Sequence, residues 1–272
     1  MTLIARSNRE ARAFAPSQPH AEPTVLKTQI DHIVVVAHTL EQGVAWCEAT
    51  LGITPEAGGD HPQFGTHNRL FKVATPSFPL AYFEIIAIKK AASQAANTTT
   101  IGQKSTKNEV KNSRWFDMDD AALQAAVAKE PRLVHFVVNT DDIQAGRAAL
   151  KAIGIDRGAA VEASRPTRKG RLEWKITVRD DGQRLFSGAL PSLIQWGKSG
   201  AEEPLRLHPR NTLPRSGVSL QSVAVTSPTP EKLQAAYDAM GLTGVTLTEG
   251  DADITVTLKT PKGLVELQSH GI

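Results

Sequence analysis

The chain has 272 residues, of which 40% are apolar and 22% are charged. This composition excludes collagen-like, fibrous and wholly disordered chains, and the length allows one large domain or two ordinary ones. The net charge of +3 does not indicate a nucleic-acid partner, and no apolar run is long enough to cross a bilayer, so we expect no membrane partner either. The single cysteine, Cys47, cannot form an internal disulfide, which favours a cytoplasmic location.

Three segments of the chain share one pattern. Each begins with a β-branched run, at residues 32–39, 135–140 and 222–227, as expected for a buried strand. An apolar pattern of helical period follows and ends at a glycine suited to stopping a helix, namely Gly52, Gly154 and Gly241. Shorter strand candidates complete each segment. The repeat therefore predicts a βαβββ unit that occurs three times.

The predicted fold class is α+β. A sheet of about four strands cannot bury its inner face alone, so we expect two tandem units, residues 28–198, to form a curved mixed sheet with a central cup. Residues 1–27 form an N-terminal arm, residues 89–113 an excursion from the first unit, and residues 199–215 a connector. The third unit, residues 216–272, either extends the core within the chain or pairs with a second subunit in a homodimer.

Four polar residues stand at matching places in otherwise apolar strands. His32 and His135 open the first strands of the first two units, and Glu84 and Gln195 lie in the last strands. A buried carboxylate needs a partner, and a metal ion shared with two imidazoles would supply one. Two His and a carboxylate suit Fe, Mn, Ni, Co or Zn, with Gln195 offering a neutral oxygen. The alternative is that both histidines are packed and hydrogen-bonded in the core.

Asp31 precedes His32 and is a candidate for orienting its imidazole. Adjacent residues of a strand face opposite sides, however, which argues against a contact between the two side chains.

Two further segments of the sequence carry candidate substrate-binding residues. The glycine-containing loop 58–65 leads into His67 and Asn68, either of which could direct a hydrogen-bond donor into the cup. Arg165 belongs to a basic cluster at residues 165–171, before Trp174, that could bind a carboxylate or phosphate. A plain turn and a solvated hairpin tip are the alternatives for these two segments.

The tandem units with these His, Glu and Gln placements resemble the vicinal oxygen chelate superfamily, which includes glyoxalase I, extradiol dioxygenases and metal-free bleomycin-resistance proteins. Several motifs resemble the branch of glyoxalase-like domain proteins: Asp31-His-Ile-Val, His61-Pro-Gln-Phe-Gly-Thr-His-Asn-Arg69, Tyr82-Phe-Glu-Ile-Ile86, Arg114-Trp-Phe116, His135-Phe-Val-Val138 and the stretch from Arg165 to Trp174. The resemblance covers residues 31–196, and the third unit more loosely.

The resemblance implies metal ligands at His32, Glu84 and His135, with Gln195 in the fourth position. Because Gln195 cannot take a proton at neutral pH, Glu84 would serve as both ligand and base, which argues against methylglyoxal isomerisation. We therefore expect a metal-dependent lyase, isomerase or dioxygenase that acts on a small oxygen-rich or anionic metabolite. The alternatives are a metal-free protein that binds a small molecule in the same cup and a non-catalytic module that assembles through its third unit.

Overall fold

The computed structural model describes residues 26–89, 113–167, 169–197 and 207–272. Most of the predicted N-terminal arm and excursion, and the first part of the connector, lie outside these residues. The first unit consists of β1 (Gln29–Val36), α1 (Leu40–Leu51), β2 (Glu56–His61), β3 (Thr66–Lys72) and β4 (Tyr82–Ile88). The second consists of β5 (Arg132–Asn139), α3 (Ile143–Ala152), β6 (Ala159–Thr167), β7 (Gly170–Val178) and β8 (Ser192–Trp196).

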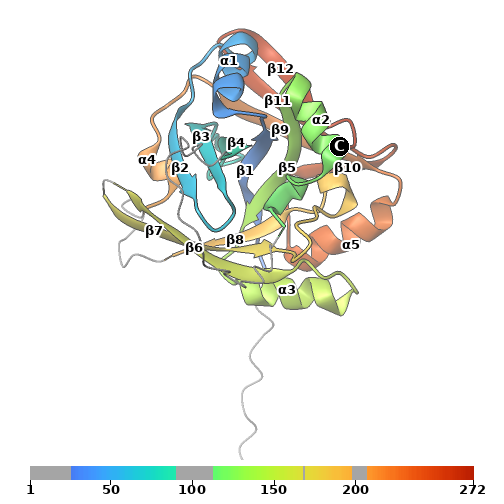
Figure 1. Cartoon of the computed structure of the whole chain (residues 1–272). Coiled ribbons are helices and arrows are strands. Elements are labelled where there is room, and N and C mark those ends of the chain that lie inside the picture. Colours follow the sequence, from blue (N-terminus) through green and yellow to red (C-terminus); the bar gives the residue numbers. More distant parts are fainter. Residues whose placement is uncertain (1–25, 90–112, 168, 198–206) are drawn as a thin grey trace, which may run out of the picture.

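The two units form one eight-stranded sheet in the order β2-β3-β4-β1-β5-β8-β7-β6. Strands β1 and β5 meet antiparallel at its centre, and in each unit the last strand pairs in parallel with the first. The sheet curves until its ends, β2 and β6, nearly meet (Figure 1). Arg165 Nη1 donates to Gly58 O at 3.2 Å and Gln63 Nε2 donates to Glu162 O at 3.3 Å across this junction. The predicted curved mixed sheet is confirmed.

Strand β1 divides the apolar core into two parts, because its side chains alternate between the faces of the sheet. Ile33 and Val35 pack on the outer side with α1 and α3, and Val34 and Val36 pack inside the curve with residues of β7 and β8. Cys47 of α1 is fully buried on the outer side, and burial raises the pKa of its thiol to about 12. Cys47 is therefore a packing residue of the outer core.

Helix α1 begins and ends as its sequence predicts. The Thr39 hydroxyl accepts a hydrogen bond from the backbone N–H of Gln42, which satisfies one of the free donors of the first turn. Gly52 follows the helix with φ of 77°, a left-handed conformation that glycine adopts without strain.

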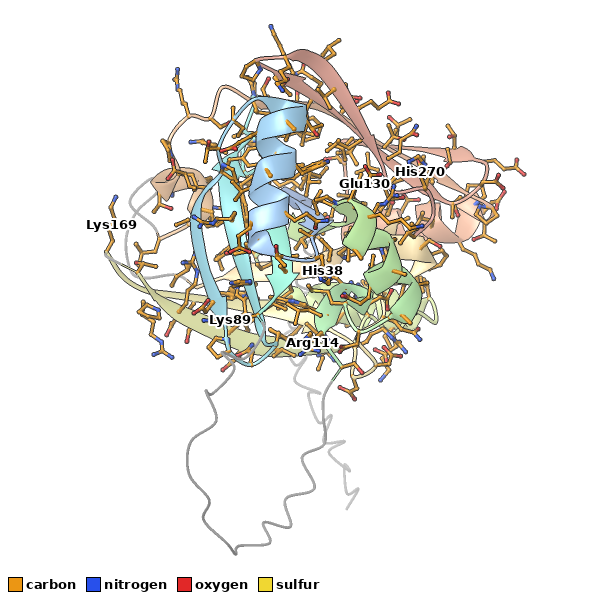
Figure 2. The ribbon with its side chains drawn as sticks, turned by 45° about the horizontal axis from the view of Figure 1, so that its top comes forward. His38, Lys89, Arg114, Glu130, Lys169 and His270 are labelled. Atoms are coloured by element: carbon orange, nitrogen blue, oxygen red, sulfur yellow. The ribbon has the colours of Figure 1, made fainter. Side chains whose placement is uncertain are left out.

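Three short elements line the inside and the open side of the curved sheet. They are η1 (Trp115–Asp117), a single 3-10 turn, α2 (Ala121–Lys129), and α4 (Pro209–Thr212), which belongs to the predicted connector. A second 3-10 turn, η2 (Phe186–Gly188), lies between β7 and β8. In Figure 2, Lys169 marks the outer tip of the β6–β7 hairpin.

The third unit has the predicted order of elements but a different sheet. It comprises β9 (Ser219–Ser227), α5 (Pro230–Met240), β10 (Val245–Glu249), β11 (Asp253–Thr260) and β12 (Gly263–Gln268). Its strands lie in the order β10-β9-β11-β12, and the parallel partner of β9 is β10 rather than the last strand. The unit packs on the outer core, where Tyr237 donates its hydroxyl to Ala189 O at 2.8 Å. It therefore extends the core within the chain; a homodimer stays a prediction.

None of the helices that the structure describes is both long enough and apolar enough to span a bilayer.

Candidate active site

A β-bulge in β1 brings Asp31 and His32 together. The pairing of β1 with β5 shifts between Ile30 and His32, so Asp31 is an extra residue and the usual alternation of side chains is interrupted. His32 Nδ1 donates to Asp31 Oδ1 at 2.7 Å, since an ionised carboxylate can only accept. The bond leaves Nε2 as the basic nitrogen of His32, and this atom lies 3.6 Å from Glu84 Oε2.

Asp31 is fully buried and accepts hydrogen bonds from four segments of the chain. Besides His32, its donors are Trp196 Nε1 at 2.9 Å, Asn139 Nδ2 at 3.1 Å and His208 Nε2 at 3.2 Å, all to Oδ2. Burial alone would raise the pKa of Asp31, but the hydrogen bonds from His208 and His32 outweigh it and hold the pKa well below its usual range. Asp31 is therefore a fixed negative charge behind His32.

Glu84 is held on its other oxygen by Asn68. Asn68 Nδ2 donates to Glu84 Oε1 at 2.5 Å, and the backbone N–H of Gly59 donates to Asn68 Oδ1 at 2.8 Å, which fixes the orientation of the amide. His61 lies behind Asn68, with Nδ1 3.1 Å from Thr66 Oγ1. Burial lowers the pKa of His61 to about 4, so this ring is neutral near pH 7.

His32, His61, Asn68 and Glu84 line a narrow cavity of about 30 Å³ inside the curved sheet. Its walls are largely aromatic and apolar: Tyr82, Trp115, Phe116, Leu172, Trp174 and Trp196 contribute to them, and Pro209 of α4 lies at the side. Arg165 reaches the cavity from β6, and no carboxylate of the described residues forms an ion pair with it. Burial lowers the pKa of Arg165, although the nearby Tyr82 and Glu84 oppose this effect.

A wider groove of about 720 Å³ adjoins the cavity. The two share Arg165 and Pro209, and the groove continues past Gly58, Lys169 and His208. A ligand larger than the cavity therefore has room beyond Arg165.

The structure brings together five of the predicted site residues and separates the others. His32, Asn68, Glu84, Arg165 and Trp174 all line the cavity. His67 does not, because it neighbours Asn68 in β3 and points to the opposite face, where partial burial lowers its pKa.

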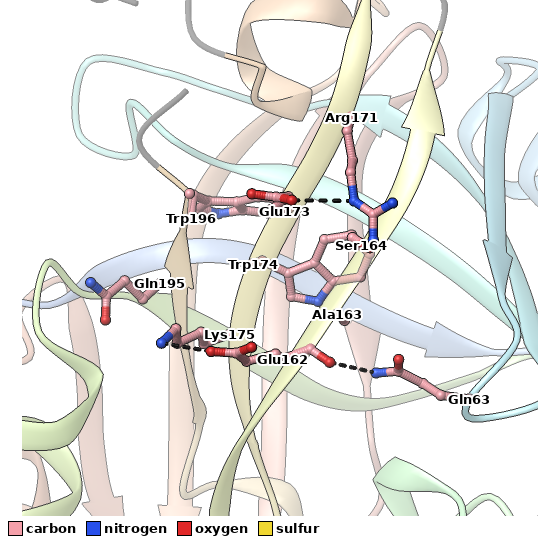
Figure 3. Close-up of a pocket in the computed structure, with 11 residues that line it drawn as sticks. Gln63, Glu162, Ala163, Ser164, Arg171, Glu173, Trp174, Lys175, Gln195 and Trp196 are labelled. Atoms are coloured by element: carbon pink, nitrogen blue, oxygen red, sulfur yellow. Dashed lines mark hydrogen bonds and ion pairs between the residues drawn. The ribbon is translucent and has the colours of Figure 1, made fainter. Parts of the chain in front are cut away.

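Gln195 lies outside the cavity. Its Oε1 accepts from the backbone N–H of Ile143 at 3.0 Å and its Nε2 donates to Asp141 O at 2.8 Å, so its side chain secures the start of α3. Figure 3 shows it beside an outer pocket of about 570 Å³, next to the exposed Glu162–Lys175 ion pair. The strand register explains the difference: Glu84 pairs with Val34, and the matching residue of the second unit, Val137, pairs with Ser192 rather than Gln195.

Both ring nitrogens of His135 form hydrogen bonds. Nδ1 donates to Gly188 O at 2.7 Å, and Nε2 accepts from the backbone N–H of Ser192 at 3.0 Å. Burial, together with the charge of Arg157, lowers the pKa of His135 well below its usual value.

Within the described parts of the chain, no three His, Cys, Asp or Glu residues form a group that could hold a metal ion. The arrangement of His32, Glu84 and His135 thus does not fit the predicted three-ligand metal set, although His32 and Glu84 face each other.

Several residues of this site were not identified as site residues from the sequence. His61 stands in a motif that resembles the glyoxalase-like branch, so a signal for it existed. Nothing in the pattern around His208 indicated that the connector would reach Asp31.

Comparison with known proteins gives the family. A family model described as a glyoxalase-like domain matches residues 30–241. This chain belongs to the glyoxalase-like domain family. The match confirms the resemblance found in the sequence and extends it into the third unit. No curated protein matches the sequence.

One solved structure is similar in fold to this family member over most of the chain. A hypothetical protein from Staphylococcus aureus is 17% identical, with a TM-score of 0.51 over 89% of this chain and 85% of that chain. A methylmalonyl-CoA epimerase from Streptomyces coelicolor, in complex with 2-nitronate-propionyl-CoA, is 16% identical, with a TM-score of 0.35 over 66% of this chain and 99% of its own. A mutant 4-hydroxymandelate synthase from Streptomyces coelicolor is 11% identical, with a TM-score of 0.43 over 89% of this chain and 63% of that chain.

Proposed function

We propose that this glyoxalase-like protein is a lyase or isomerase that moves a proton on a small, oxygen-rich, anionic metabolite. The observation that carries the proposal is the buried series Asp31–His32–Glu84 at a cavity that Arg165 also lines. A general base needs a lone pair directed at the substrate, and the bond to Asp31 leaves that lone pair on His32 Nε2.

His32 takes the proton of the substrate, and the fixed negative charge of Asp31 stabilises the imidazolium that forms. The proton then passes from His32 Nε2 to Glu84 Oε2, 3.6 Å away, and Glu84 returns it to the substrate at a neighbouring position, which leaves both side chains as they began. The Asn68 amide keeps the carboxylate in place through its bond to Oε1. Together these groups serve both halves of a proton transfer.

Arg165 is the proposed anchor for a carboxylate or phosphate of the substrate. A guanidinium binds such groups through parallel hydrogen bonds, and no carboxylate within the described chain forms an ion pair with Arg165. The cavity of about 30 Å³ accepts the reacting end, and the adjoining groove takes the rest of the molecule.

Proton exchange in D₂O tests this function. Aldehydes, hemithioacetals, catechols and 2-oxo acids are incubated with the protein, and loss of each proton signal is followed by ¹H NMR. We expect exchange with at least one compound, lowered about a hundredfold or more in His32→Gln and in Glu84→Gln. His67→Gln is the matched control, because that side chain lies on the other face of β3. Exchange at the wild-type rate in both folded variants would contradict the proposal. Compounds that raise the melting temperature without exchange would instead support the binding-protein alternative.

Metal analysis tests the predicted divalent metal separately. The predicted set requires that His135→Ala lose bound metal as His32→Ala does. Because both ring nitrogens of His135 are engaged elsewhere, we expect His135→Ala to keep the metal content of the purified wild-type protein. Equal losses in the two variants would restore the three-ligand set.

A further inference from the structure

A buried arginine in the second unit has no acidic partner. Arg157 is 3% exposed, and its Nε donates to Pro191 O at 3.0 Å. Its Nη2 donates to Ser192 Oγ and lies 3.3 Å from His135 Nε2. All three partners are neutral, and no Asp or Glu of the described chain lies within ion-pair distance of Arg157. A buried, uncompensated charge is costly, and burial accordingly lowers the pKa of Arg157 to about 10.

Arg157 lines a second small cavity, of about 10 Å³, which is divided from the candidate active site by the shared residues Trp115 and Phe116. Arg179 and Arg184 also line it, but each is paired with an acid, Asp181 and Asp117 respectively. The positive charge left without compensation in this cavity is therefore that of Arg157.

A residue of the cavity wall carries a second donor without a partner. Trp115, which is 4% exposed, lines both this cavity and the candidate active site, and its indole Nε1 is buried without a hydrogen bond to any described residue. Ser192 and Thr177 add hydroxyl groups to the lining. A guanidinium and an indole N–H are both donors, so the cavity offers what an anion requires.

We propose that this cavity binds a single halide ion, chloride under ordinary conditions, which compensates Arg157. The size of the cavity decides between anions. About 10 Å³ is the space of a single water, so of the common anions only a monoatomic ion approaches this size, whereas sulfate and phosphate far exceed it. The site lies in the second unit and does not depend on the proton transfer proposed for the first.

³⁵Cl NMR of the wild-type protein tests the proposal, because chloride exchanging with a protein site has a broadened signal. We expect a broadening that rises in proportion to protein, falls as added chloride saturates the site, is displaced by bromide and is unaffected by sulfate at equal ionic strength. No saturable broadening, or displacement by sulfate as effective as by bromide, would overturn the proposal without the need for any variant.

Two variants locate the site. Arg157→Gln removes the charge, and we expect chloride affinity to fall about tenfold to a hundredfold. Trp115→Phe keeps the stacking ring and removes one donor, so we expect a loss of about threefold to tenfold. Arg171→Gln, at an exposed arginine paired with Glu173, is the matched control and should bind chloride as the wild type does. Folding of each variant is checked by circular dichroism. Undiminished broadening in folded Arg157→Gln would place the ion elsewhere and refute the assignment.

Discussion

The two units of the curved sheet present the same backbone with different chemistry. Each first strand carries a bulge just before its histidine, with Asp31 as the extra residue in β1 and Val134 in β5. His32 therefore has a carboxylate beside it, whereas His135 bonds to the carbonyl of Gly188.

The last strands differ in the same way. The place of Glu84 in the first unit is taken by Ser192 in the second, as the parallel registers show. Asn68, which pairs with Ile86, corresponds to Ile176, which pairs with Ile194. One half therefore carries acid–base groups, and the other carries a neutral histidine that accepts from Arg157. The repeat supplies equivalent positions, and the residues at those positions decide which half carries the proposed acid–base groups.

Replacing Asp31 should have the largest effect on this difference. Asp31→Asn replaces the carboxylate with a neutral amide. The amide does not fix His32 in one tautomer, and it does not stabilise the imidazolium that forms. We expect proton exchange to fall about a hundredfold or more, measured by the same ¹H NMR assay. Val134→Ala, at the matching bulge, is the control and should retain the rate if folded. A rate in Asp31→Asn within a few-fold of wild type would contradict the role of this carboxylate.

The pH dependence of the unfolding free energy should show that His135 is neutral in the folded protein. Its folded pKa is lowered, so below pH of about 6.5 the unfolded chain binds a proton that the folded chain does not. The free energy of unfolding then falls as the pH falls, and each such histidine contributes a slope of about 1.4 kcal/mol per pH unit. Urea unfolding between pH 7 and pH 5 measures this slope. We expect His135→Gln to have a shallower slope and the exposed His270→Gln to match wild type. Identical slopes in all three proteins would show that His135 is protonated in the fold.

The smallest effect is expected at Gln195. Its side chain bonds to Ile143 N–H and Asp141 O, so Gln195→Ala should lose about 1 kcal/mol of unfolding free energy. The proton-exchange rate should stay unchanged, because Gln195 lies outside the cavity lining. The melting temperature and the NMR assay check both expectations. A large loss of exchange with normal stability would return Gln195 to the catalytic residues.

The elements with strong patterns were predictable from the sequence, and the two edge strands of the curved sheet were not. The strand–helix repeats and the glycine ends of α1 and α5 follow from apolar period and turn residues. Strand β2 contains Gly58 and Gly59, and β6 contains Pro166, all residues that weaken a strand pattern. Both lie at the ends of the sheet, where such residues are tolerated.

The site was only partly predictable, because strand register is a property of the folded sheet. His32, Glu84, Asn68 and Arg165 were identified, since polar residues in apolar strands and basic residues near an aromatic are visible in the sequence. The contact of Asp31 with His32 depends on a bulge that the sequence does not mark. The order of strands in the third unit likewise depends on packing between segments far apart in the chain, so a common order of elements did not reveal it.

The two ends of the curved sheet, β2 and β6, are held together differently from its other strands. Neighbouring strands elsewhere in this sheet are held by ladders of backbone hydrogen bonds, whereas Arg165 and Gln63 join its two ends through single side chains. The aliphatic stem of Arg165 also passes close to Gly59, where a Cβ atom would lie 2.7 Å from its Cδ. An anion that binds the Arg165 guanidinium competes with the Gly58 carbonyl for the same Nη1 donor. Binding of the proposed anionic substrate to Arg165 would therefore weaken one of the two side-chain bonds that join β2 and β6.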